Sequence, residues 1–215
     1  MPKKKKLNKK EKQEVFESTI PILKKMFKKK PSIMGFDLST SATGFFHLFV
    51  VNSASSYGQL VKSEKKGNHI NVRIVDIVDT LSNFVKTNSN SIAVIEDYSF
   101  GLRGSSVAQL AELGGCVKSL LLKEGIGFFK VAPQTLKKFV LGPSRGKASG
   151  KEFMLLEVMD RWNRKFSSSD VCDAFCLAKF IETLGQYVND PDSLRKWEQD
   201  MFFDFVVNRG IPIGR

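Results

Sequence analysis

The sequence predicts an α/β fold in which a mixed, five-stranded sheet is flanked by helices. Two observations support this prediction. Three runs rich in β-branched and aromatic residues follow one another between residues 33 and 63, before any amphipathic helix begins. From residue 91 onward, a strand–helix–strand pattern is followed by further helices. A plain doubly wound sheet would alternate strand and helix from its start, so the early run of strands favours a mixed sheet.

Each predicted strand has a local signature. The first and fourth, at residues 33–39 and 91–98, contain continuous apolar runs that lead into acidic residues, as expected for strands buried on both faces. The second, at 44–52, is rich in aromatic and β-branched residues, and the small residues 40–43 connect it tightly to the first. The remaining strands are predicted at 57–63 and 127–132.

Apolar residues recur at helical spacing between and after these strands. The predicted helices cover residues 70–86, 106–124, 134–140, 151–162 and 170–187. Gly125 is the predicted C-cap of the second helix, and Pro133 begins the third. The last helix has three N-capping candidates, Ser167, Ser168 and Ser169. This order of strands and helices matches an RNase H-like sheet.

We expect one globular domain at residues 32–188 with an extension on each side. The N-terminal extension, 1–31, is lysine-rich: residues 1–30 contain 12 Lys and 3 Glu, and so carry most of the net charge of +12. Its lysines could neutralise phosphates or only solubilise the chain. We expect residues 1–12 to be disordered and an amphipathic helix, interrupted by Pro21, to follow. Residues 189–215 form a C-terminal helical extension, with an amphipathic segment at 194–207.

Composition argues against several classes of protein. No apolar run approaches the roughly 20 residues of a membrane helix, and the basic N-terminus lacks the apolar region of a secretory signal. The cysteines Cys116, Cys172 and Cys176 are odd in number and lack the spacing of a disulfide framework. We therefore expect a cytoplasmic or otherwise intracellular protein with no membrane partner, which would lie in the host cell or be virion-associated if its source is viral.

Four carboxylates stand out from the 22 acidic residues by their positions. Asp37 and Glu96 end the apolar runs of the first and fourth strands. Asp170 and Asp173 lie at i and i+3 near the start of the last long helix, so both lie on one helical face. Each has an ordinary explanation alone, such as a turn or a favourable interaction with a helix dipole. Asp97 alternates to the other side of its strand, so we interpret it as a supporting or surface residue.

Phosphodiester hydrolysis offers one reason for all four acids. Two divalent cations about 4 Å apart can hold the attacking and leaving oxygens of a phosphate, and they need carboxylates that converge from different elements. A buried carboxylate without such a partner is strongly disfavoured. The sequence therefore predicts a two-metal site with four ligands: Asp37, Glu96, Asp170 and Asp173.

These acids lie in segments that resemble the RuvC family of Holliday-junction resolvases. The acidic positions match in GFDLSTSATG, AVIEDYSFG and SSSDVCDAFCLA, and the segments AQLAELGGCVKSLL, VAPQTLKKFVLG and GKASGKEFMLLEVM resemble what lies between them in the family. The likeness covers about residues 32–187, in the family's order. It implies a crossover junction endodeoxyribonuclease with an RNase H-like fold that uses Mg²⁺, with Mn²⁺ as a substitute, at two ions per active site. It also implies a homodimer that acts on branched DNA.

The resemblance also indicates other residues that meet DNA. Lys151, in GKASGKEFMLLEVM, is our candidate for a transition-state contact, since positive charge there offsets charge on the phosphorane. Tyr98 and Phe100 bracket the position of the family's junction-opening aromatic, and the pattern does not choose between them. Three further DNA-binding candidates could equally be solvated loop residues: Arg103, Arg145 and Lys147.

Two other classes of function stay open from the sequence. One is a non-catalytic module that binds branched nucleic acid, although four mutually repelling carboxylates without a metal would destabilise it. The other is an actin-like ATPase or sugar kinase, because FDLSTSATG also resembles the first phosphate-binding hairpin of that superfamily. Those folds need two such domains and a second phosphate loop, and a chain of 215 residues is too short for both.

Overall fold

The structure, a computed structural model, describes residues 7–29, 32–65, 67, 69–98, 105–143 and 150–214. Its five strands are β1 (Ser32–Asp37), β2 (Thr43–Phe49), β3 (Tyr57–Val61), β4 (Ser91–Glu96) and β5 (Phe128–Val131). They form one sheet in the order β3-β2-β1-β4-β5. β1 pairs antiparallel with β2 and parallel with β4, so the prediction of a mixed, five-stranded sheet is confirmed.

The two central strands, β1 and β4, end on their acidic residues, Asp37 and Glu96. The second strand is shorter than predicted and stops at Phe49, whose N–H donates a hydrogen bond to the Ser56 hydroxyl at 2.9 Å. A short 3-10 helix, η1 (Ser53–Ser55), fills the space before β3. The two strands that carry the acids each stop two residues earlier than predicted, at the acidic residues themselves.

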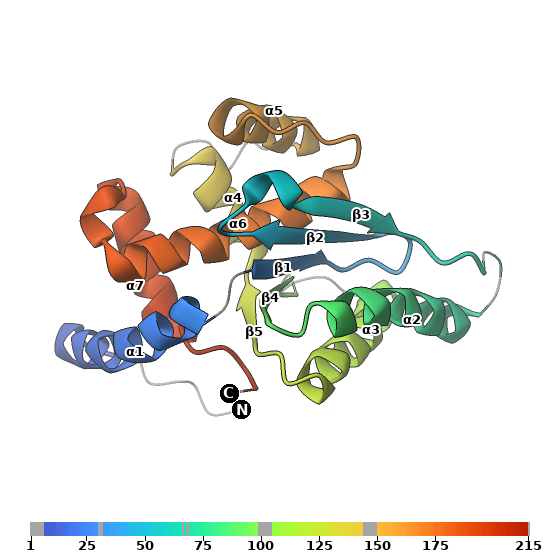
Figure 1. The fold of residues 1–215 in the computed structure, drawn as a ribbon, viewed down its shortest axis with the longest axis horizontal. Helices are drawn as coiled ribbons and strands as arrows, with labels where there is room; N and C mark the ends of the chain where they lie inside the picture. Colours follow the sequence, from blue (N-terminus) through green and yellow to red (C-terminus); the bar gives the residue numbers. More distant parts are fainter. Residues whose placement is uncertain are drawn as a thin grey trace.

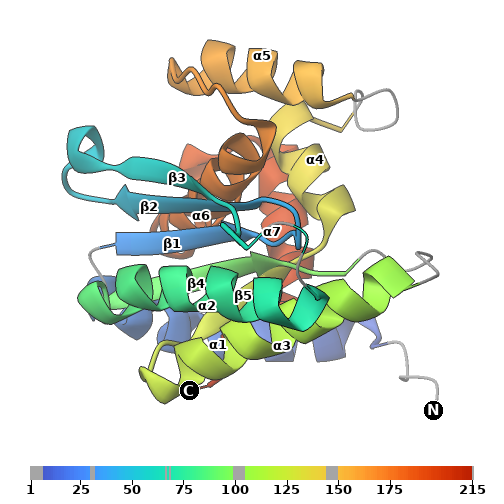
Figure 2. The same ribbon diagram turned by 90° about the vertical axis from the view of Figure 1, so that its right-hand side faces the viewer.

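Helices cover both faces of the sheet (Figures 1 and 2). One face carries α2 (Ile70–Thr87) and α3 (Ser105–Lys123), and the other carries α4 (Pro133–Leu141), α5 (Lys151–Trp162) and α6 (Ser169–Asn189). The predicted C-cap of α3 is confirmed: Gly125 has φ of 66°, and the Ile126 N–H donates to the Leu121 carbonyl at 2.8 Å. No described helix is long and apolar enough to cross a membrane.

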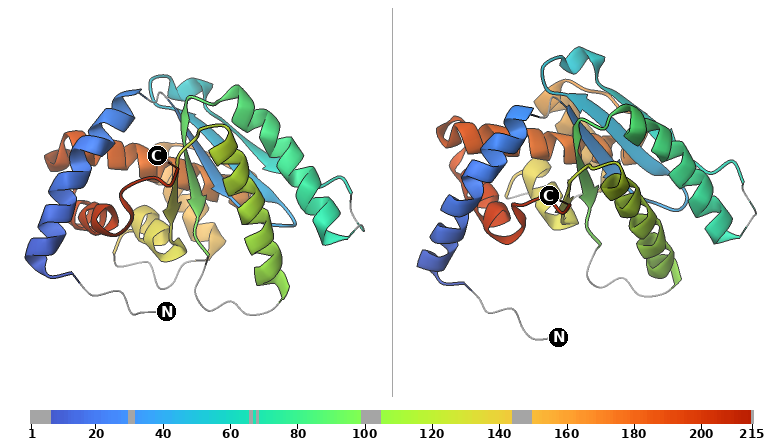
Figure 3. Two further views of the ribbon diagram at one scale, coloured as in Figure 1. Left: turned by 90° about the horizontal axis from the view of Figure 1, so that it is seen from below. Right: turned by 60° about the horizontal axis from the view of Figure 1, so that its bottom comes forward.

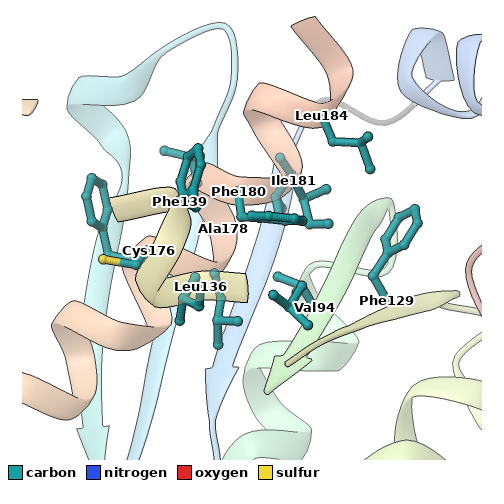
Figure 4. Packing of buried hydrophobic residues seen from close by; sticks show 14 of the residues in the cluster. Val94, Phe129, Leu136, Phe139, Cys176, Ala178, Phe180, Ile181 and Leu184 are labelled. Carbon is teal, nitrogen blue, oxygen red and sulfur yellow. The ribbon is translucent and has the colours of Figure 1, made fainter. Parts of the chain in front are cut away.

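The central helix, α6, lies against the sheet and buries 14 of its 21 residues. In Figure 4, Phe180 and Ile181 of this helix lie among Val94 of β4, Phe129 of β5 and Phe139 of α4. The rings of Phe139 and Phe180 meet edge to face, with centroids 5.3 Å apart. A helix buried on most of its surface has little freedom to shift, so it provides a rigid base for residues in its first turns.

The N-terminal extension contains a helix that begins earlier than predicted. α1 (Lys9–Lys29) starts inside the stretch expected to be disordered, so that expectation is wrong from residue 9 onward. Asn8 and Glu11 explain this start, because the Asn8 side chain accepts from the Glu11 N–H at 3.0 Å and the Glu11 carboxylate accepts from the Asn8 N–H at 2.7 Å. This reciprocal pair is a capping box. The helix then continues through Pro21 as a single element.

The two extensions pack against each other. After a short 3-10 helix, η2 (Pro191–Ser193), the chain forms α7 (Lys196–Arg209), which lies beside α1 (Figure 3). The rings of Phe16 in α1 and Phe203 in α7 have centroids 4.9 Å apart, and Lys12 lies 3.3 Å from Asp204. Leu23 of α1 is fully buried in the same core cluster as α6. Both extensions are therefore part of the hydrophobic core.

Candidate active site

Asp37 and Glu96 meet at one edge of the sheet. They are the last residues of β1 and β4, which run parallel and place Phe36 opposite Ile95. Neighbouring parallel strands end at the same edge, so the predicted convergence of these two carboxylates is confirmed. Among the charged neighbours of Asp37, Glu96 has the largest effect on its pKa.

The first turns of α6 bring Asp170 and Asp173 to this edge. Of the three capping candidates, the structure uses Ser168, whose hydroxyl accepts a hydrogen bond from the Val171 N–H at 3.4 Å. The helix comes very close to β1 at Gly35, where a Cβ would lie 2.0 Å from the Ala174 carbonyl oxygen. A glycine in the strand is therefore what lets this helix approach the end of β1.

Burial and mutual repulsion raise the pKa values of three of these carboxyl groups. Burial, and then the charges of Glu96, Asp173 and Asp170, raise the pKa of Asp37 from 3.8 to about 8, although Lys151 opposes them. Burial and then Asp173 raise the pKa of Glu96 to about 7. Burial is also the main reason that the pKa of Asp173 is raised to about 6. The acids are thus close enough to disfavour full ionisation near neutral pH without a counter-charge.

Lys151, the first residue of α5, reaches the acidic cluster. Its Nζ lies 3.1 Å from Asp170 Oδ1 and donates to the Ser169 hydroxyl, also at 3.1 Å. The hydrogen bond with Asp170 raises the pKa of Lys151, which keeps the ammonium group charged. The Lys151 side chain is 69% exposed, so this ion pair adds little stability and leaves the ammonium accessible to a phosphate.

A second lysine, Lys137 on α4, lies at the site and was missed by the sequence analysis. It lines a small cavity of about 140 Å³ together with Glu96, Asp173 and Lys151. Its charge acts to lower the pKa of both acids, against the larger effect of burial. The sheet order could have indicated Lys137. β5 is the parallel neighbour of β4, and α4 follows β5 directly, so the first turns of α4 start beside Glu96.

The donor set suits a hard divalent cation such as Mg²⁺ or Mn²⁺, which prefers carboxylate oxygens. Burial and then repulsion among the acids raise the pKa of Asp37 to about 8, and a cation would remove the repulsion. Among the described residues, no three His, Cys, Asp or Glu side chains are grouped closely enough to hold one ion by themselves. Mg²⁺ is usually bound by one or two carboxylates plus waters and substrate phosphates, so a shared set of acids fits it.

Asp97 is buried, so of the two interpretations of this residue, as a supporting or as a surface residue, the second is wrong. Only 8% of the residue is exposed, and its carboxylate bonds to Lys130 Nζ at 2.8 Å and to the guanidinium of Arg209. Burial alone would raise the pKa of Asp97, but its hydrogen bonds with these two cations hold it below its usual range. The partners come from β5 and α7, far away in the sequence, so alternation along β4 could not reveal them.

Tyr98 is the only DNA-contact candidate, apart from Lys151, that lies within the described residues. Its side chain packs on α3, where its hydroxyl donates to the Ala111 carbonyl at 3.4 Å and accepts from Lys118 Nζ at 3.2 Å. A Cβ at Gly114 would lie 2.1 Å from the Tyr98 hydroxyl oxygen, so that glycine makes room for it. The other candidates lie outside the described residues and stay predictions: Phe100, Arg103, Arg145 and Lys147.

Comparison with known proteins agrees with this geometry. Residues 33–180 match the model of the family described as crossover junction endodeoxyribonuclease RuvC. The solved structure of Thermus thermophilus RuvC is 17% identical, with a TM-score of 0.58 over 74% of this chain and 95% of that chain. T. thermophilus RuvC in complex with Holliday junction substrate is 15% identical, with a TM-score of 0.57 over 74% and 94%. No curated protein matches. The matched segment contains all four acids and excludes α1 and α7.

Proposed function

The chain belongs to the RuvC family of crossover junction endodeoxyribonucleases, and on that premise we propose that four acids form its catalytic metal site: Asp37, Glu96, Asp170 and Asp173. Family membership makes the chain a metal-dependent endonuclease that resolves Holliday junctions. The observation that supports the site is the convergence of carboxylates from β1, β4 and α6, close enough that burial and repulsion raise the pKa of Asp37 to about 8.

We propose Mg²⁺ as the cofactor, with Mn²⁺ as a substitute and two ions per site. When bound, the metal would act as a Lewis acid on the scissile phosphate and lower the pKa of an attacking water. Asp37 is affected electrostatically by the other three acids, so it is our candidate for the ligand that both ions share. Glu96, Asp170 and Asp173 would complete the two coordination shells.

Lys137 and Lys151 are placed to act on the phosphate rather than on the metal. Both line the cavity next to Glu96 and Asp173, and each carries an ammonium group that can approach a non-bridging oxygen. Positive charge fixed where negative charge develops lowers the barrier to hydrolysis. We assign both lysines to transition-state stabilisation.

Substrate binding is assigned to the segments around the site. We propose branched DNA as the substrate and a homodimer as the active species, since paired cuts across a four-way junction need two active sites. Arg103, Arg145 and Lys147 are proposed to contact phosphates. Tyr98 and Phe100 are the two aromatic candidates for opening the junction by stacking on an unpaired base.

A nuclease assay tests this proposal. Wild-type protein is incubated with four-way, three-way, flap and linear duplex DNA at one salt concentration, with Mg²⁺, with Mn²⁺ or with neither. We expect metal-dependent nicking that favours the four-way junction and is lost in Asp37→Asn. Asp160→Asn, which removes an exposed carboxylate from α5, is the matched control and should keep full activity.

Three results would contradict the proposal. Tight junction binding without nicking in either metal would identify a non-catalytic binding module. A thermal shift caused by ATP in the absence of DNA would favour the actin-like alternative. Asp37→Asn protein that nicks as fast as the wild type would remove Asp37 from the site.

A further inference from the structure

The backbone that follows Glu96 is fixed from the side opposite the metal site. Successive residues of a strand point to opposite faces, so Asp97 projects away from the site that Glu96 faces. The Asp97 N–H donates to the Val131 carbonyl at 2.7 Å, and its carboxylate accepts from the Tyr98 N–H at 3.1 Å. The carboxylate also bonds to Lys130 and Arg209. Two elements therefore hold the end of β4: β5 and α7.

Arg209 is the partner that lies outside the nuclease domain shared with the family. It is the last residue of α7, and the family match ends at residue 180. The Arg209 side chain is 35% exposed, whereas the Asp97 side chain is 7% exposed. A buried carboxylate needs charged partners. One of the two partners of Asp97 therefore comes from the part of the chain that follows the family match.

The chain after Arg209 is also attached near this strand. The Ile213 N–H donates to the Phe128 carbonyl at 2.9 Å, and the Phe128 N–H donates to the Ile213 carbonyl at 3.1 Å. This antiparallel bridge lies at the first residue of β5, on the outer edge of the sheet. The C-terminal segment therefore runs along β5, held at one end by Arg209 and at the other by Ile213.

We propose that Arg209 is a positioning residue: through its ion pair with Asp97 it holds the end of β4 so that the Glu96 carboxylate faces the metal site. This inference rests on the proposed function of Glu96. Lys130 alone could neutralise Asp97. The second cation, Arg209, therefore fixes the orientation of the Asp97 carboxylate rather than balancing its charge. With contacts on β5 and α7, the Asp97 carboxylate cannot rotate without breaking one of them. The C-terminal extension thereby helps to position the Glu96 carboxylate, although it supplies none of the proposed metal ligands.

The same helix provides a matched control. At its other end, Glu198 forms a buried ion pair with Arg161 of α5. Glu198→Gln therefore also breaks a buried ion pair of α7, but it leaves the contacts of Asp97 intact. Arg209→Met removes the positive charge beside Asp97. Arg209→Lys keeps a positive charge there but replaces the planar guanidinium with a flexible ammonium group.

Two measurements on the full chain test the proposal. The first is hydrogen–deuterium exchange of metal-free protein, followed at the amides of residues 95–98. We expect exchange about fivefold faster or more in Arg209→Met, an intermediate rate in Arg209→Lys and the wild-type rate in Glu198→Gln. The second is the Mg²⁺ concentration that gives half-maximal junction cleavage. It should rise several-fold in Arg209→Met, while the rate at saturating Mg²⁺ falls much less.

Wild-type exchange at residues 95–98 in Arg209→Met would overturn the proposal. So would equal changes in both measurements for Arg209→Met and Glu198→Gln at matched unfolding temperatures, because that would indicate a general loss of α7 packing. If the wild type cleaves no junction, the proposed function fails. The exchange rates then still decide whether Arg209 holds the end of β4.

Discussion

Gly44 and Asp170 touch backbone to backbone: a Cβ at position 44 would lie 2.0 Å from the carbonyl oxygen of Asp170. Gly44 is also paired with Asp37 in the register of β1 and β2. One glycine therefore sets the distance between a strand-end acid and a helix-start acid of the proposed site. This contact accounts for the glycine at position 44, and it needs no bound nucleotide.

We expect Gly44→Ala to abolish most junction cleavage, because the added methyl group on β2 must push the first turn of α6 away from the sheet. Overpacking of this kind costs about 1–3 kcal/mol, so the variant should still fold at moderate temperature. Gly115→Ala is the control, since a Cβ there meets nothing within 4 Å and alanine favours the helix. Cleavage rates measured at a temperature where both variants are folded give the result, and full activity in Gly44→Ala would contradict the contact.

The metal-free protein should become more stable when Asp37 is neutralised. The pKa of Asp37 in the folded state is raised from 3.8 to about 8. The contribution of the Asp37 carboxyl group to the stability of the folded state is therefore complete below pH ~4 and is lost as the pH rises through 8. Each pKa unit is worth about 1.4 kcal/mol, so the cost at pH 8 is on the order of several kcal/mol. We expect Asp37→Asn to raise the unfolding temperature at pH 8 by about 5–10 °C, and by less at pH 5.

Calorimetry in a chelating buffer measures this difference, with Asp160→Asn as the control for a change in net charge. Mg²⁺ should stabilise the wild type at pH 8 and have a smaller effect on Asp37→Asn, because the variant has less repulsion to relieve. If Asp37→Asn unfolded at a lower temperature than the wild type at pH 8, positive charge in the metal-free protein would already balance the Asp37 carboxylate, and the prediction would be wrong.

Lys137→Met and Lys151→Met should each slow cleavage by about 10²-fold, the usual cost of losing one group that stabilises a transition state. Binding of a four-way junction in Ca²⁺ should change little, because each variant removes a single charge. Lys138→Met is the matched control: Lys138 is adjacent on α4 but exposed and outside the cavity. Equal losses for Lys137→Met and Lys138→Met would mean that the charge of α4 matters only for general DNA affinity.

The two aromatic candidates should behave differently. Tyr98 is held by Gly114 and Lys118 on α3, so Tyr98→Ala should lower the free energy of unfolding by about 1–3 kcal/mol. Phe100→Ala should selectively reduce cleavage of junction DNA. Thermal unfolding and single-turnover cleavage separate these effects, and selective loss of cleavage in Tyr98→Ala alone would reverse the assignment.

The sequence predicted where the four acids lie but not which residues support them, for a physical reason. Asp37 and Glu96 end apolar strands, and Asp170 with Asp173 share one helical face, so local periodicity was enough to single them out. The partners of Asp97 come from β5 and α7, and only the folded chain brings them together. Lys137 and Lys138 look alike in a helical pattern, and the sheet order is what separates them. The domain boundaries at residues 31 and 188 stay a prediction.

The short pairing between Ile213 and Phe128 has a consequence for self-association. Open sheet edges recruit further strands, and proteins commonly protect them by covering or blocking them. Here the chain's own tail occupies the start of the β5 edge. At the opposite margin of the sheet, β3 has a strand partner on one side only among the described residues. No described residue pairs with the outer edge of β3, so strand addition by a second copy would meet less obstruction there than at the start of β5.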